Sequence, residues 1–192
     1  MSLHRSSLQP AVHAGDHTAG AADAPVTLVE YGDFQCPHCA RAHPVVQEIQ
    51  RRMGDRLRFV FRNFPLTEVH PFAGHAAEAS ESVAERAGSA AYWAMNHQLF
   101  AHQADSSRAL ADRHLAEYAA TSGASGEEVL ADIAAGRFTE RVASDFMSGV
   151  KSGVNGTPTF FIHGERFDGN WGDVDEFAAA LEDAASSPEA AR

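Results

Sequence analysis

Residues 26–39 read VTLVEYGDFQCPHC, a strand-like run followed by two cysteines that are separated by two residues. β-Branched and apolar residues continue almost unbroken from Val26 to Tyr31, which predicts a buried strand. Pro37 suits the first position of a helix, where its missing N–H costs nothing. The segment therefore predicts a strand, a turn and a helix that begins at the cysteine pair.

Cys36 and Cys39 are the only cysteines among 192 residues. On the first turn of a helix, positions i and i+3 share a face, so the two thiols can close an intramolecular disulfide with little rearrangement of the chain. In a reducing compartment, an isolated cysteine pair is more often catalytic or metal-binding than structural. The pair therefore indicates a redox centre and leaves a metal site as an alternative.

The composition narrows the class of protein. A chain of 192 residues that is 44% hydrophobic can bury one good core, and we expect one domain with an insertion. The net charge is −11, with 15 basic against 26 acidic residues and no basic stripe, which argues against a nucleic-acid partner. No apolar run has the length of a membrane span and no secretory signal is present, so we expect no membrane association and a cytoplasmic location, or a periplasmic or secreted one if a leader was removed.

The remaining elements follow from periodicity and turn residues. Residues 57–62 are predicted to form a second strand, which completes a β-α-β unit with the first strand and its helix. From about residue 70 to 152 the apolar spacing is helical throughout. A short hairpin is expected around His163-Gly164, followed by a helix that Asp173 caps. The predicted boundaries are a loose N-terminal arm, or one packed on the domain, at 1–24, a first part of the main domain at 25–66, a helical insertion at 67–150, a second part at 151–184 and a tail at 185–192.

Two motifs carry a resemblance to a known family. The segment FQCPHC at 34–39 resembles the active site of the DsbA-like thiol-disulfide oxidoreductases, and VNGTPTFF at 154–161 is similar to the cis-proline loop of that family. The resemblance spans roughly residues 24–184. It implies an α/β fold, a thioredoxin-like domain with a helical insertion, and an enzyme that exchanges a Cys36-Cys39 dithiol or disulfide with protein thiols or disulfides. It implies no cofactor and no metal, and an unidentified redox partner that recycles the protein.

The resemblance implies a role for each residue of the motif, and each role has a physical reason. Cys36 begins the helix, where backbone N–H groups and the positive end of the helix dipole favour the thiolate, so Cys36 is the expected nucleophile. Cys39, one turn deeper, is the expected resolving thiol. His38, with Pro37 beside it, can stabilise the Cys36 thiolate, and its position favours this role over the alternative of a solvent-exposed histidine without one.

Three residues outside the motif complete the expected site. The family's loop implies a cis peptide bond between Thr157 and Pro158, whose backbone would pair with an extended substrate segment. Taken alone, an ordinary turn is the simpler interpretation of these residues. Glu30 stands six residues before Cys36, where thioredoxin-like proteins often have a buried acid that can accept a proton from Cys39, and an ordinary glutamate at a strand end is nearly as plausible.

Three other functions stay open. Cys36 and Cys39 could bind zinc with His38 or His43 and a distant histidine, although the chain has no second CxxC. The chain could be a redox-silent module that binds peptides or acts as a chaperone. A glutathione-dependent enzyme on a related fold is more distant, because such enzymes typically have no second cysteine. Five further histidines are expected to have surface or capping roles, namely His70, His75, His97, His102 and His114.

Overall fold

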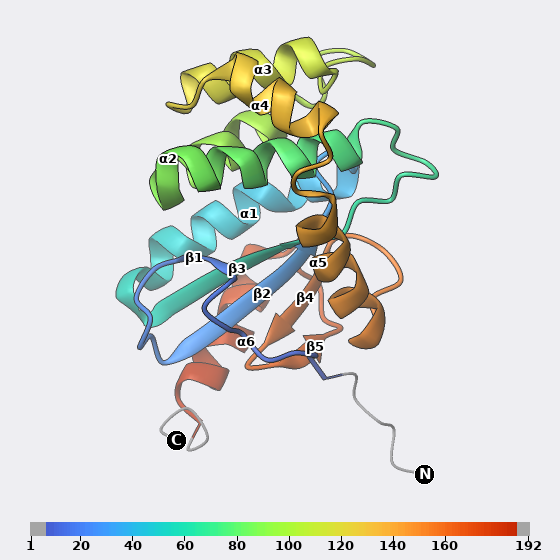
Figure 1. Cartoon of the computed structure of the whole chain (residues 1–192). Helices are drawn as coiled ribbons and strands as arrows, with labels where there is room; N and C mark the ends of the chain where they lie inside the picture. Colours follow the sequence, from blue (N-terminus) through green and yellow to red (C-terminus); the bar gives the residue numbers. More distant parts are fainter. Residues whose placement is uncertain (1–6, 188–192) are drawn as a thin grey trace. The chain divides into compact units, whose positions relative to one another are not determined.

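The structure of the chain is a computed structural model that describes residues 7–187. The described chain forms two compact units (Figure 1). We call residues 7–31, 41–62 and 148–187 the sheet unit, and residues 32–40 and 63–147 the helical unit. The cysteine motif belongs to the helical unit, and the proposed domain boundaries stay a prediction.

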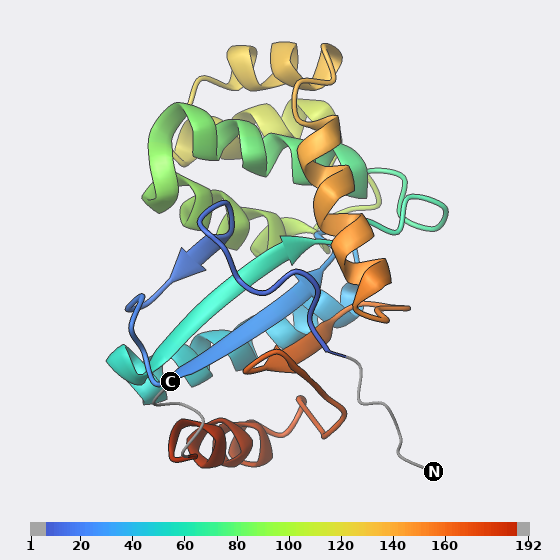
Figure 2. The same cartoon turned by 60° about the horizontal axis from the view of Figure 1, so that its bottom comes forward.

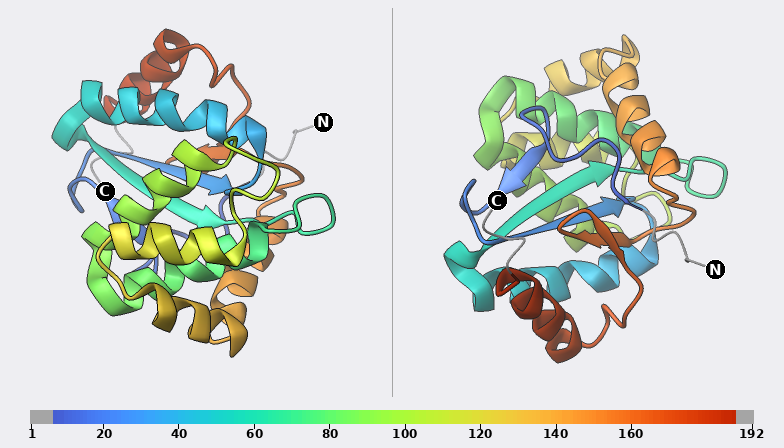
Figure 3. Two further views of the ribbon diagram at one scale, coloured as in Figure 1. Left: turned by 90° about the horizontal axis from the view of Figure 1, so that it is seen from above. Right: turned by 90° about the horizontal axis from the view of Figure 1, so that it is seen from below.

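A five-stranded sheet in the order β1-β3-β2-β4-β5 forms the framework of the sheet unit. The neighbouring strands β2 and β3 point the same way, as a β-α-β unit requires, and β4 pairs antiparallel with β2 (Figure 3). The burial of β2 and β3 on both faces explains their nearly continuous apolar sequence. The strands span His17–Ala19, Val26–Gly32, Leu57–Asn63, Thr159–Ile162 and Glu165–Phe167 in chain order.

Two helices, α1 (Pro37–Met53) and α6 (Val174–Ala185), lie on the same side of the sheet (Figure 2). Phe177 of α6 is fully buried, and its ring lies 5.0 Å from that of Phe160 on β4. The side chain of Asp173 caps α6, as predicted, by accepting hydrogen bonds from the amides of Asp175 and Glu176. The apolar side of α6 is therefore held against the hairpin of β4 and β5.

The predicted hairpin turn is confirmed. His163 and Gly164 separate β4 from β5, and both have positive φ angles, of 49° and 81°. Two left-handed residues match the twist of a two-residue hairpin, and a glycine adopts this conformation without strain. The turn thus fixes the register in which Phe161 faces Arg166.

The described part of the N-terminal segment is packed on the sheet unit. Within its described part, strand β1 pairs antiparallel with β3, with Thr18 opposite Val60. The side chain of Arg62, 1% exposed, donates two hydrogen bonds to the carboxylate of Asp16, at 2.8 and 2.9 Å, and others to the carbonyl oxygens of Pro10 and Ala11. The segment is integrated into the sheet unit through these contacts, and residues 1–6 lie outside the described part.

The helical unit confirms the predicted run of helices. Its first helix, α2, contains a break at Gly88, where φ is 83°. The pairs among α2, α3 and α4 all pack together, and Asp132 of α4 binds Arg86 of α2 at 2.8 Å. The helices span Ala73–His102 (α2), Asp112–Thr121 (α3), Gly126–Ala134 (α4) and Thr139–Lys151 (α5), whose last residues belong to the sheet unit.

Two further findings concern the whole described chain. Among residues 7–187, each helix is too short or too polar to cross a lipid bilayer. The chain's last helix ends at Ala185, and of the tail predicted at 185–192, residues 188–192 lie outside the described part.

Candidate active site

The cysteine motif forms the start of α1. The first residue of α1 is Pro37, and the carbonyl oxygen of Cys36 accepts the hydrogen bond from the amide of Ala40 at 3.1 Å. Cys36 therefore stands immediately before the helix, where backbone N–H groups without intrahelical partners favour an anionic sulfur. Both cysteines are thiols and both are buried, Cys36 at 4% exposure and Cys39 at 0%.

The turn before the motif is held by the buried carboxylate of Asp33. Its Oδ1 atom accepts a hydrogen bond from the amide of Gln35 at 2.7 Å, and its Oδ2 atom accepts one from the amide of Leu66 at 2.8 Å. The Nδ1 atom of His70 lies 2.7 Å from the same Oδ2 atom. A carboxylate with partners from three segments fixes the path of the chain into the helix.

The backbone of Asp33 contacts the second cysteine directly. Its amide donates a hydrogen bond to Sγ of Cys39 at 3.5 Å, and its carbonyl oxygen accepts one from the amide of Cys36 at 3.1 Å. A donor that faces sulfur stabilises the thiolate relative to the thiol. The turn thus supplies Cys39 with an N–H group at the position where negative charge develops when the thiol is deprotonated.

Two glutamines connect the motif to the rest of the helical unit. The Oε1 atom of Gln35 accepts a hydrogen bond from the amide of Phe72 at 2.7 Å. From the end of α2, the side chain of Gln103 donates hydrogen bonds to the carbonyl oxygens of Phe34 and Cys36, at 2.9 and 3.3 Å. The backbone around Cys36 is therefore held from two sides by side-chain amides.

The other predicted site residues lie as follows. Pro37 and His38 are exposed on the first turn of α1. Glu30 is buried on β2, opposite Phe160 of β4, and belongs to the sheet unit. The peptide bond between Thr157 and Pro158 is cis, and the two residues lead into β4 in the same unit.

No group of three or more His, Cys, Asp or Glu residues within 7–187 is arranged to hold a metal ion. Four of the five histidines that were expected to have surface or capping roles lie against carboxylates. His75 binds Asp112 at 2.7 Å and His102 binds Asp105 at 2.8 Å, and the ring nitrogens of His70 and His114 likewise lie against Asp33 and Glu117.

Sequence reasoning missed the residues that hold the motif in place. Asp33 and Gln35 lie in the turn that the sequence predicts between strand and helix, where a polar residue three positions before a helix-initiating cysteine is a signal for a turn-stabilising side chain. His70 is expected from the sequence to have only a surface or capping role. Gln103 lies 67 residues from Cys36, and no local pattern distinguishes it from other polar residues at a helix end.

Comparisons with known proteins agree with this arrangement. A family model described as Thioredoxin matches residues 13–183. The oxidised BdbD structure from Bacillus subtilis covers 95% of this chain, and the match includes 99% of that protein, with a TM-score of 0.84 and 26% identity.

Two further solved structures share the fold. One is the thiol-disulfide exchange protein alpha-DsbA2 from Wolbachia pipientis, with a TM-score of 0.74 and 17% identity over 88% of this chain and 87% of that one. The other is MdbA from Corynebacterium diphtheriae, a thiol-disulfide oxidoreductase, with a TM-score of 0.68 and 22% identity over 86% and 85% of the two chains.

The curated relatives are much longer proteins. A protein from Mycolicibacterium gilvum named Na(+)/H(+) antiporter NhaA 1 is 38% identical over 91% of this chain, and a protein of the same name from Salinispora arenicola is 39% identical over 86%. The matches cover 27% and 24% of those proteins, so the chain spans about a quarter of their length.

Proposed function

This chain belongs to the thioredoxin family and has the fold of the DsbA-like thiol-disulfide oxidoreductases, and on that basis we propose that Cys36 and Cys39 exchange a disulfide with protein substrates. The observation that carries the proposal is the placement of Cys36 immediately before α1 and of Cys39 on its first turn, with the amide of Asp33 donating to Sγ of Cys39.

The reaction proceeds in two exchanges. The Cys36 thiolate attacks one sulfur of a substrate disulfide, which forms a mixed disulfide and releases the other substrate sulfur as a thiolate. The Cys39 thiolate then attacks Sγ of Cys36, which forms the Cys36-Cys39 disulfide and releases the second substrate sulfur. Two electrons pass from this protein to the substrate, and the reverse sequence oxidises a substrate dithiol by the same two electrons.

Cys39 must lose its proton before it attacks, and the turn at Asp33 supports this step. The amide of Asp33 stabilises the developing thiolate, and the Asp33 carboxylate holds the turn through Gln35, Leu66 and His70. Asp33 and His70 are positioning residues in this scheme. Glu30, buried on β2, is retained as a candidate proton acceptor for Cys39.

Substrate binding is assigned to the loop of Thr157 and Pro158. These residues lead into β4, and we propose that their backbone pairs with an extended substrate segment. The partners are proteins with thiols or disulfides, together with a redox partner that restores the starting state. The redox potential of the surrounding compartment sets the direction of electron flow.

The antiporter names belong to proteins about four times as long as the matched segment. We propose that the segment is a thiol-exchange unit in both contexts, and ion transport is not proposed for this chain.

The test traps the mixed disulfide. The Cys39→Ser variant keeps the attacking thiol and loses the resolving one, so it is expected to accumulate a covalent complex with a disulfide-containing protein such as insulin. Cys36→Ser is the matched control and is expected to accumulate none. Equal trapping by the two variants, or trapping by neither while the wild type fails to reduce insulin, contradicts the proposal.

A further inference from the structure

The arginines of the helical unit divide into two groups. Three of the five form ion pairs with carboxylates, namely Arg86, Arg137 and Arg141. The other two, Arg108 and Arg113, are exposed and form no ion pair with a carboxylate of residues 7–187. Acidic residues outnumber arginines in this unit. Arg108 and Arg113 therefore differ from the other arginines of the unit, whose charges are compensated by carboxylates.

Both of these arginines line one surface pocket of about 590 Å³. The guanidinium of Arg108 lies over the ring of Phe72 at 5.8 Å. Arg113 donates from Nε to a ring nitrogen of His114 at 3.1 Å. The remaining lining is Pro71, Ala111 and the pair of His75 and Asp112, whose carboxylate is held at 2.7 Å. The pocket thus combines apolar lining residues with two arginines that have no carboxylate partner within residues 7–187.

A hydrogen bond connects the pocket to the cysteine motif. The amide of Phe72, one of the lining residues, donates to the side chain of Gln35, the residue before Cys36. Standard bond lengths then place the Cα atoms of Phe72 and Cys36 within about 13 Å of each other, roughly four residues of extended chain. A substrate segment whose cysteine reacts with Cys36 can therefore reach the pocket with a residue two to four positions away.

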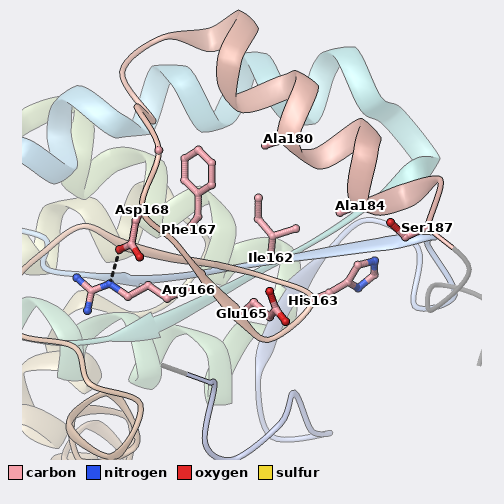
Figure 4. Close-up of a pocket in the computed structure, with 10 residues that line it drawn as sticks. Ile162, His163, Glu165, Arg166, Phe167, Asp168, Ala180, Ala184 and Ser187 are labelled. Carbon is pink, nitrogen blue, oxygen red and sulfur yellow. Dashed lines mark hydrogen bonds and ion pairs between the residues drawn. The ribbon is translucent and has the colours of Figure 1, made fainter. Parts of the chain in front are cut away.

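A second pocket provides a contrast. It lies between the β4–β5 hairpin and α6, has a volume of about 800 Å³, and also contains an arginine (Figure 4). That arginine, Arg166, is paired with Asp168 at 3.0 Å and donates to the carbonyl oxygen of Gly153 at 2.8 Å. Its charge is already compensated, whereas the charges of Arg108 and Arg113 are available to a ligand.

We propose that the pocket of Arg108 and Arg113 is a substrate subsite that binds the carboxylate of an Asp or Glu side chain close to the reactive cysteine of a substrate polypeptide. The two guanidiniums face the carboxylate, and the methylene groups of the acidic side chain lie over Phe72 and Pro71. The proposal rests on thiol-disulfide exchange at Cys36 and adds the class of sequence that the protein prefers.

The test compares two peptides that each have one cysteine in a mixed disulfide with 2-mercaptoethanol and that differ only by Glu or Gln three residues from the cysteine. The rate constant for reduction by the wild-type dithiol is expected to be about 3- to 10-fold larger for the Glu peptide at low salt, because two exposed ion pairs contribute. The preference should shrink in 0.5 M NaCl.

The Arg108→Gln/Arg113→Gln double variant is expected to lose the preference. The double variant Arg56→Gln/Lys151→Gln removes the same amount of charge from exposed positions of the sheet unit, and it should retain the preference for the Glu peptide. The neutral disulfide 4,4′-dithiodipyridine should react equally with all three proteins.

The outcomes separate the two proposals. A Glu preference that persists in the Arg108→Gln/Arg113→Gln variant, or is absent from the wild type while dithiodipyridine still reacts, overturns the subsite and leaves the exchange reaction standing. A wild-type protein that does not react with dithiodipyridine overturns the exchange reaction itself. If oxidised glutathione alone shows a rate that depends on Arg108 and Arg113, the pocket takes a small thiol and the polypeptide assignment is wrong.

Discussion

The carboxylate of Asp33 holds the turn that leads into the cysteine motif. It accepts from the amides of Gln35 and Leu66 and contacts His70, with its side chain at 0% exposure. Buried donors that lose their acceptor carry the full cost of desolvation. The turn that leads into the two cysteines is therefore held by the buried side chain of Asp33.

Replacement of this carboxylate should destabilise the protein. Asp33→Ala leaves two backbone amides without their acceptor, and we expect the free energy of unfolding to fall by about 2–4 kcal/mol in a urea titration. Asp105→Ala, at an exposed position beside His102, is the matched control and should change it by less than about 0.5 kcal/mol. Similar values for the two variants would show that the three contacts of Asp33 contribute little.

Substitution of the exposed residue His38 tests whether its side chain affects the redox potential of Cys36 and Cys39. We propose that His38 stabilises the Cys36 thiolate and with it the reduced form, so His38→Ala should shift the midpoint potential of the cysteine pair to more negative values by roughly 15–60 mV. Equilibration with glutathione buffers measures this shift. His97→Ala, at an exposed position of α2, should leave the midpoint within about 10 mV, and an equal shift in both variants would exclude a specific role for His38.

At the scale of elements, α2 and α4 are joined by a carboxylate whose protonation can be measured. Hydrogen bonding to Arg86 is the largest cause that holds the pKa of Asp132 at about 2, against a burial effect in the opposite direction, and Ser82 and Arg137 lower the pKa further. Because the pKa of Asp132 is lower in the folded state, its stabilising contribution is present above pH 3.8 and is lost as the pH falls toward 2.

Asp132→Asn should remove this pH dependence. Between pH 6 and pH 2.5 the wild type is expected to lose roughly 1–2 kcal/mol more of its free energy of unfolding than the variant. Urea titrations at the two pH values measure the difference. An equal loss in both proteins would mean that Asp132 is not linked to folding through Arg86.

The N-terminal segment is the element that depends most on one side chain. Burial favours the neutral acid, but hydrogen bonds from Arg62 and the His13 amide outweigh it and lower the pKa of Asp16. Asp16→Asn leaves the guanidinium of Arg62 buried with an uncompensated charge, so the free energy of unfolding should fall by about 3 kcal/mol at pH 7. Asp23→Asn, an exposed acid of the same segment, is the control. A loss below about 1 kcal/mol for Asp16→Asn would show that the segment is held by other contacts.

At the scale of the whole molecule, local signals predicted the elements that have clear periodicity or caps. The unbroken apolar run of β2, Pro37 at the start of α1 and Asp173 before α6 each have a local physical cause, and the structure confirms these elements. The family resemblance at residues 34–39 and 154–161 predicted the fold as a whole, and the solved structures share this fold.

The remainder could not be predicted because it depends on tertiary contacts. Strand β1 has three residues without apolar alternation and exists through its pairing with β3. Arg62 appears in the sequence as the polar end of a strand, yet it is buried against Asp16. Gln103 binds the backbone of Cys36 from the end of a 30-residue helix. In each case the partner is distant in sequence, so no local pattern reveals the contact.

The central claim, that Cys36 and Cys39 form an exchanging pair, is tested most directly by equilibrating the intact protein in glutathione buffers of graded ratio, quenching with acid, and counting and locating the thiols by alkylation and mass spectrometry. We predict that both thiols disappear together in a single two-electron transition, with a Cys36-Cys39 disulfide as the product. Cys36→Ser should show no such transition. Thiols that never pair, or that form separate glutathione adducts in two independent steps, would contradict the account.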